Sequence, residues 1–213
     1  MKVVIVGAGE VGFHIASHLA VENKDVVVID RDPNALRRVS DSIDVQVVVG
    51  SGGSPLVLEE AGVKQAEILL AVTDSDETNL VACLVANVVS PSTKKIARIR
   101  DADYDGYVDA FRDNPPYIDT LINPETEVVK TISWMMRFPG ATDVGDFAEG
   151  RVKFVGIYLD EGAKVVDIPL EGLADQIGKK MPLIAAVIRN EKLMIPRGSF
   201  KLQAGDMVYF ITD

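Results

Sequence analysis

The stretch "VVIVGAGEVG", residues 3–12, decides the fold of this chain. It places Gly7, Gly9 and Gly12 in the spacing G-x-G-x-x-G directly behind a short apolar run. In dinucleotide-binding turns, the first glycine permits a tight turn, the second lets the backbone approach a pyrophosphate, and the third lets the helix pack against the strand. The motif alone is a weak signal, because any tight strand-to-helix turn favours glycine. Asp30, 18 residues after Gly12 at the end of the next apolar run, strengthens it, so we predict a strand, a phosphate-binding turn and a helix.

Short β-branched runs alternate with segments of helical period from residue 2 to about residue 122. This alternation predicts an α/β fold, a Rossmann-like doubly wound parallel sheet in which helices cover the apolar strands on both faces. The expected strands are residues 2–6, 25–29, 45–49, 67–72, 94–99 and 117–122. Helices are expected to begin near Glu10, Pro33, Pro55, Asp76 and Tyr104, with Asp32 and Ser54 as N-caps before the two prolines.

A longer helix is predicted over residues 124–138, with Asn123 as its N-cap and Pro139-Gly140 as its end. Its apolar side chains cover much of its circumference, so it is expected to pack on a second subunit or domain. A small α+β lobe of antiparallel character follows, with strands near 151–159, 183–190, 192–196 and 206–212. The expected organisation is a nucleotide-binding domain over 1–122, a crossover and hinge helix over 123–140, and a C-terminal ligand or interaction lobe over 141–213.

Composition excludes several function classes. The chain carries 22 lysines and arginines against 32 acids, a net charge of −10, which repels nucleic acid and anionic lipid surfaces. A single cysteine, Cys83, excludes an internal disulfide and a C-x-x-C zinc or redox motif, and is typical of the reducing cytosol. The apolar stretch 80–89 is too short to span a membrane, and no export signal opens the chain.

The residues indicate dinucleotide binding without an evident catalytic pair. Asp30 can accept the hydroxyls of the adenosine ribose, which favours NAD over NADP, while the neighbouring Arg31 weakens that preference. No tyrosine has a lysine four residues later, and the two histidines, His14 and His18, lie on the first helix with no third ligand for a metal. From the tyrosines and histidines, we expect neither a catalytic nor a metal site. A lysine-based catalytic site stays open at this point as the alternative.

Several stretches carry a resemblance to a known family. They are "VVIVGAGEVG", "VVVIDRDP", "VVVGSGGSPLVLEEAGV", "AEILLAVTDSDETNLVAC", "KIARIRDADY" and "LINPE", followed by "FPGATDVGDFAEGRV" and "IPRGSFKLQAGDMVYFI". Of these, "AVTDSDETNLVAC", residues 71–83, is the most specific. In them the chain resembles the RCK-type (regulator of potassium conductance) cytoplasmic subunits, and among these the Trk-type potassium-uptake regulators. The last two stretches resemble that family's hinge and C-terminal lobe.

The resemblance implies a site for NAD or NADH, with ATP and ADP as further candidates. Carried over residue by residue, the glycine loop (residues 7–12) would hold the pyrophosphate, the end of the second strand the ribose, and the ends of the later strands the rest of the crevice. Ser51 has no long polar side chain with which to select a base. The residues implied are Gly7, Ala8, Gly9, Glu10, Val11, Gly12, Asp30, Arg31, Gly50, Ser51, Thr73, Asp74, Arg98 and, as the weaker of the two phosphate-pairing arginines, Arg100.

The resemblance also implies a role. The chain would be a regulatory subunit, assembled with itself as a dimer or larger ring and attached through a membrane potassium transporter to the inner face of the cell membrane. Ligand would shift the population of its conformations, with the helix over 124–138 as transmitter. Close relatives carry two such halves in tandem, so the chain is either a single-half member or the first half of a longer protein. The alternatives are a NAD-dependent oxidoreductase, or a nucleotide sensor for another transporter or a transcription factor.

Overall fold

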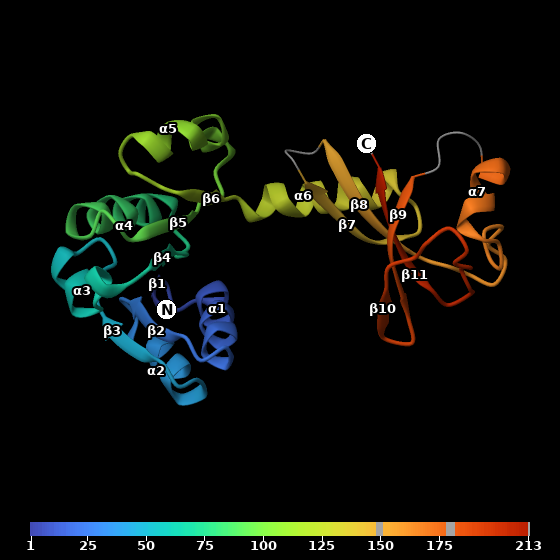
Figure 1. Cartoon of the computed structure of the whole chain (residues 1–213). Helices are drawn as coiled ribbons and strands as arrows, with labels where there is room; N and C mark the ends of the chain where they lie inside the picture. Colours follow the sequence, from blue (N-terminus) through green and yellow to red (C-terminus); the bar gives the residue numbers. More distant parts are fainter. Residues whose placement is uncertain (148–150, 178–181, 213) are drawn as a thin grey trace. The chain divides into compact units, whose positions relative to one another are not determined.

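The apolar runs of the N-terminal half form a six-stranded sheet in the order β3-β2-β1-β4-β5-β6, with all neighbouring strands parallel (Figure 1). The strands are β1 (Lys2–Val6), β2 (Asp25–Asp30), β3 (Gln46–Val49), β4 (Ile68–Ala71), β5 (Lys94–Arg98) and β6 (Thr120–Ile122). The order reverses between β1 and β4, which creates a crevice at the carboxyl ends of these strands. The predicted doubly wound parallel sheet is confirmed.

The computed structural model describes residues 1–147, 151–177 and 182–212. They divide into two units, Met1–Thr126 and Glu127–Asp213. In the first unit, α1 (Glu10–Val21) and α2 (Pro33–Ser42) pack on one face of the sheet, while α3 (Pro55–Glu60), α4 (Asp76–Val89) and α5 (Val108–Asp113) pack on the other. Cys83 is buried on α4, and burial raises the pKa of its thiol to about 12, so it is a neutral core residue.

The predicted helix starts hold with two differences. The Asp32 carboxylate caps α2 by accepting the N–H of Asn34 at 2.9 Å. Ser54 is the N-cap residue of α3 as predicted, although its side chain makes no cap hydrogen bond. The helix expected near Tyr104 begins as a 3-10 helix, Ala102–Tyr107, and becomes α-helical only at Val108; a short 3-10 helix, Val63–Gln65, also precedes β4.

The second unit holds an antiparallel sheet in the order β10-β9-β11-β8-β7, as expected of an α+β lobe. Its elements are α6 (Pro124–Arg137, which begins in the first unit), β7 (Ala141–Phe147), β8 (Val152–Tyr158), α7 (Leu170–Ile177), β9 (Leu183–Arg189), β10 (Lys192–Met194) and β11 (Met207–Thr212). β7 was not among the expected strands, because the family resemblance assigned this stretch to the hinge. As an edge strand that pairs with β8, β7 does not need an apolar pattern. Residues 148–150 of that expected hinge lie outside the described residues.

In the second unit, an ion pair between Arg189 and the buried Asp206 joins β9 to the turn before β11. Asp206 is fully buried and accepts two hydrogen bonds from the Arg189 guanidinium, at 2.6 and 2.7 Å, and one from the backbone N–H of Gln203 at 2.8 Å. Burial by itself would raise the pKa of this carboxyl, but the bonds from Arg189 and Gln203 outweigh burial and lower it. The pair therefore holds the turn before β11 against β9.

The helix α6 exposes apolar side chains within the described chain. Val128, Val129, Ile132, Met135 and Met136 are each more than half exposed, from 52 to 77 %. Packing of this helix on a second subunit remains a prediction. Within the part of the chain that the structure describes, no helix combines the length and apolarity needed to cross a membrane.

Candidate nucleotide-binding site

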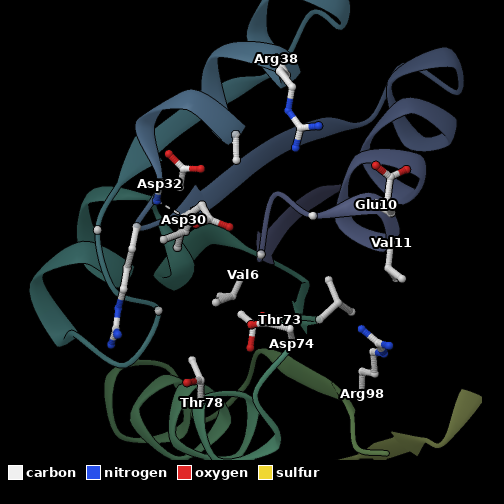
Figure 2. A pocket seen from close by; sticks show the side chains of 18 residues that line it. Val6, Glu10, Val11, Asp30, Asp32, Arg38, Thr73, Asp74, Thr78 and Arg98 are labelled. Carbon is white, nitrogen blue, oxygen red and sulfur yellow. Dashed lines mark hydrogen bonds between the residues drawn. The ribbon is translucent and has the colours of Figure 1, made fainter.

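A cavity of about 540 Å3 opens at the carboxyl ends of β1, β2, β4 and β5, where the strand order reverses (Figure 2). This volume lies within the range of small-molecule sites. In Figure 2, Asp30 and Asp32 lie at one end of the cavity, and Arg98 and Asp74 lie at the other. Its polar lining consists of Glu10, Asp30, Arg31, Asp32, Arg38, Thr73, Asp74, Thr78 and Arg98.

The glycine loop has the geometry that close approach to a phosphate requires. Gly7 has a φ of +114°, a conformation that other residues rarely adopt. A Cβ on Gly12 would lie 1.8 Å from the Gly7 carbonyl oxygen, so this glycine serves helix packing, whereas a Cβ on Gly9 would meet nothing within 4 Å. The first bond of α1 runs from the N–H of Phe13 to the Gly9 carbonyl, which leaves the N–H groups in the first turn of α1 for an anion.

Asp30 is fixed by the loop that it borders. Its Oδ2 accepts the N–H of Ala8 at 2.6 Å, and its Oδ1 accepts the N–H of Asp32 at 2.9 Å. A carboxylate has about four acceptor positions, so lone pairs remain for ribose hydroxyls. Asp30 is therefore pre-oriented, and Ala8 contributes to the site as its anchor instead of lining the cavity.

Arg31 and the loop after β3 form the wall beside Asp30. The Arg31 guanidinium donates to Ser51 Oγ at 2.8 Å, and the N–H of Gly53 donates to the same oxygen at 3.3 Å. Arg31 and Gly50 line the cavity, and Ser51 does not. Arg38 also lines the cavity, and the sequence analysis did not identify it. It lies three residues after the cavity-lining Ala35 on α2, and residues at this helical spacing share one face of the helix.

The far wall is organised by Asn79, a fully buried residue on α4 that the sequence reasoning also missed. Its Oδ1 accepts the N–H of Thr73 at 2.9 Å and the hydroxyl of Thr73 at 2.7 Å. Its Nδ2 donates to the carbonyls of Thr73 and Arg98 at 3.2 and 2.8 Å. One amide thus joins the ends of β4 and β5, and it holds Thr73 where it lines the cavity beside Asp74.

The two candidate arginines differ. Arg98 lines the cavity, and its Nε is one of two buried side-chain atoms of the described chain that have no hydrogen-bond partner. Such an atom suits a bound anion. The Arg100 side chain instead donates to the Asp74 carbonyl and lies 4.0 Å from Asp76, outside the cavity lining. Because β5 ends at Arg98, strand alternation does not extend to Arg100, and Arg100 does not share the cavity wall with Arg98.

The arrangement fits the phosphates and ribose of a nucleotide. Backbone N–H groups and Arg98 could meet negative charge, and Asp30 could accept hydroxyls. Of the described residues, none of the histidines, tyrosines or lysines lines the cavity, and no group of three potential metal ligands occurs. His14 instead lies on α1, 3.7 Å from Glu10.

Comparison with known proteins places this geometry in context. The model of the TrkA-N domain family matches residues 3–124. The Trk system potassium uptake proteins TrkA of Azorhizobium caulinodans and Halomonas elongata are 42 % and 37 % identical over 99 % of this chain. The chain spans only 46 % of each of these relatives.

Solved structures share the fold at low identity. A structure described as the GsuK channel bound to NAD has a TM-score of 0.66 at 16 % identity, covering 99 % of this chain and 37 % of that one. The GsuK RCK domain gives a TM-score of 0.65 at 17 % identity, covering 99 % of this chain and 44 % of that one.

Proposed function

Because this chain belongs to the TrkA-N domain family, we propose that it is a nucleotide-sensing regulatory subunit of a potassium-uptake system, or one half of such a subunit. The nucleotide is NAD or NADH, with ATP and ADP as further candidates. It binds in the cavity at the strand reversal. The domains proposed for these roles are the nucleotide-binding domain over 1–122, the hinge helix over 123–140 and the C-terminal lobe over 141–213.

One observation carries this proposal: the glycine loop, Asp30 and Arg98 line the same cavity. Gly9 leaves open space beside the helix N-terminus, where a pyrophosphate would sit, and Asp30 presents its remaining lone pairs at the ribose end. Ala8, Gly12 and Ser51 have supporting roles in this proposal. Ala8 and Ser51 hydrogen-bond the cavity-lining residues Asp30 and Arg31, and Gly12 lets α1 pack against the loop. The NAD-bound structure named above supports a dinucleotide by likeness of fold.

The output of the subunit is a change of conformation. A ligand shifts such an equilibrium only through its different affinity for two states, typically by about 1–3 kcal/mol per coupled site. We propose that the subunit forms a homo-oligomer, a dimer or larger ring, and that it acts on a membrane potassium transporter from the cytoplasmic face. The exposed apolar residues of α6 support self-association.

Binding is tested by titration calorimetry with NAD, NADH, ATP and ADP. Asp30→Ala and Arg98→Ala should each weaken the best ligand by about 1–3 kcal/mol, or roughly 5- to 150-fold, the loss expected for hydrogen bonds to charged groups. Arg112→Ala is the matched control, because Arg112 is an exposed arginine on α5 that pairs with Asp109 at 3.5 Å. Failure of all four ligands to bind, or equal losses in the control, would refute a nucleotide site here.

Self-association is tested separately. The double variant Ile132→Asp, Met136→Asp places charges on the exposed face of α6 and should convert oligomers to monomers in light scattering. Intact oligomers in this variant would reject α6 as the contact. The alternative of an oxidoreductase is tested by incubating the chain with NAD and small alcohols or acids, and a steady rise of NADH absorbance would favour it.

A further inference from the structure

The end of β5 is bonded to α4 on one side. The Asp76 carboxylate, at the first position of α4, accepts the N–H groups of Arg100 and Asp101 through Oδ2, both at 2.9 Å. Two residues earlier, the Arg98 carbonyl accepts Nδ2 of Asn79 at 2.8 Å. The backbone from Arg98 to Asp101 is therefore held against the first turns of α4.

The same segment is bonded on its other side to the start of α6. The N–H of Ile99 donates to the carbonyl of Ile122 at 3.0 Å. Next in the chain, Asn123 is 7 % exposed, and its Nδ2 donates to the Arg100 carbonyl and to Asp105 Oδ1, both at 3.3 Å. Its Oδ1 accepts the N–H of Thr126 at 3.2 Å, so Asn123 also caps α6.

Two polar atoms mark this segment as one that a ligand can rearrange. Asp76 Oδ1 and Arg98 Nε are the buried side-chain atoms without a hydrogen-bond partner among the residues described, and they belong to the carboxylate that holds this segment and to the arginine at its start. A buried polar atom left unpaired is unfavourable, so an arrangement that pairs it is favoured when one becomes accessible. A phosphate group at Arg98 offers Nε a charged acceptor.

We propose that residues 98–100, held between Asp76 of α4 and Asn123 of α6, couple phosphate binding at Arg98 to the first turn of α6. This coupling rests on the proposed nucleotide-binding function. Drawing the Arg98 side chain toward a phosphate moves its backbone, and the Arg100 carbonyl carries that displacement to Asn123. Because α6 continues beyond the first unit, a change at its N-terminus is passed along the helix.

The test uses NAD and ATP as probes and reads α6 independently of binding. Hydrogen exchange of the α6 amides reports its first turns, and fluorescence of Trp134, the chain's one tryptophan, reports its later turns. In the wild type, a saturating probe should change exchange in the first turns of α6 by about fivefold or more, the lower end of typical coupling. Calorimetry on the same sample measures affinity.

Asn123→Ser separates coupling from capping. Serine is as good an N-cap as asparagine, but it removes the Nδ2 bonds to Arg100 and Asp105. This variant should still bind the probe while losing most of the change in α6. Asn114→Ser is the matched control, since exposed Asn114 follows α5 outside this network and should keep the full response. Asp76→Ala removes the hydrogen bonds from Arg100 and Asp101 on the α4 side of the segment, and it serves as a second variant if Asn123→Ser does not fold.

The outcomes are distinct. A full α6 response in Asn123→Ser or Asp76→Ala would overturn the coupling, as would wild-type binding with α6 unchanged. Absence of probe binding by the wild type would refute the proposed function itself, and the coupling with it. Loss of the α6 response in Asn114→Ser as well would also overturn it, because the effect would then not depend on this network.

Discussion

Asn79 is the residue whose replacement most sharply tests how the cavity is held. Its side-chain amide makes four hydrogen bonds from a fully buried position, and all four reach Thr73 or Arg98. Asn79→Leu keeps the approximate volume and removes every one of these bonds. The Thr73 hydroxyl keeps a partner in the Ser75 carbonyl at 3.1 Å, so three backbone groups lose theirs: the N–H and carbonyl of Thr73 and the carbonyl of Arg98.

The size of the loss follows from these groups. Three unpaired backbone groups at about 2 kcal/mol each, less about 2 kcal/mol regained by burying the leucine, leave a net loss of about 4 kcal/mol. Asn79→Asp should be at least as damaging, because a buried carboxylate oxygen would face two carbonyls. Both variants should also bind nucleotide at least tenfold more weakly, about 1.4 kcal/mol, since the ends of β4 and β5 are released.

Urea unfolding followed by far-ultraviolet circular dichroism measures the stability, because Trp134 lies in the second unit and does not report on this one. Asn34→Leu is the control: Asn34 is exposed in the first turn of α2, and its replacement should change stability by less than about 0.5 kcal/mol. A loss below about 1 kcal/mol in Asn79→Leu, where unpaired buried groups predict more, would refute this reasoning.

Three further changes test other parts of the molecule. Gly12→Ala should abolish nucleotide binding in calorimetry and lower the melting temperature, because the new Cβ would lie 1.8 Å from the Gly7 carbonyl oxygen; wild-type values would contradict the packing role. Lys95→Met should lower the free energy of unfolding in urea by about 3 kcal/mol, because the buried Lys95 ammonium donates three hydrogen bonds and each acceptor would lose its donor. A change near zero would contradict this. The Asp206 carboxyl, whose pKa is lowered in the folded state, should stabilise fully above about pH 4 and lose that contribution as pH falls further. Arg189→Met should therefore flatten this acid slope in urea unfolding, and an unchanged slope would assign it to other groups.

The main lines of the first unit could be predicted because its signals are local. Glycine spacing, apolar runs and the acid at the end of β2 are each readable within a few residues, and Gly7 and Asp30 lie where they were expected. The strand β7 escaped prediction because an edge strand is defined by its partner, here β8, and not by its own pattern. Ser54 kept its position but not its bond, since a cap depends on a rotamer that spacing does not fix.

The candidate site shows the same division. Thr73 and Arg98, which the family resemblance implied, line the cavity because each lies at or just after the end of its own strand. Asn79 could not be predicted, because its role arises from four bonds to residues 6 and 19 positions away. Arg100, the weaker candidate, lies outside the cavity lining because it follows the end of β5.

The double anchoring of Asp30 has a consequence for anyone who redesigns the nucleotide preference proposed for this protein. The usual route toward NADP exchanges the acid at the end of the second strand for a small neutral residue, which here would also release the N–H of Ala8 and slacken the phosphate loop. The same carboxylate would therefore affect both the choice between NAD and NADP and the affinity of the loop for phosphate. Retaining Asp30 and varying Arg31 and Arg38, which also line the cavity, would let a designer adjust selectivity while leaving the glycine loop intact.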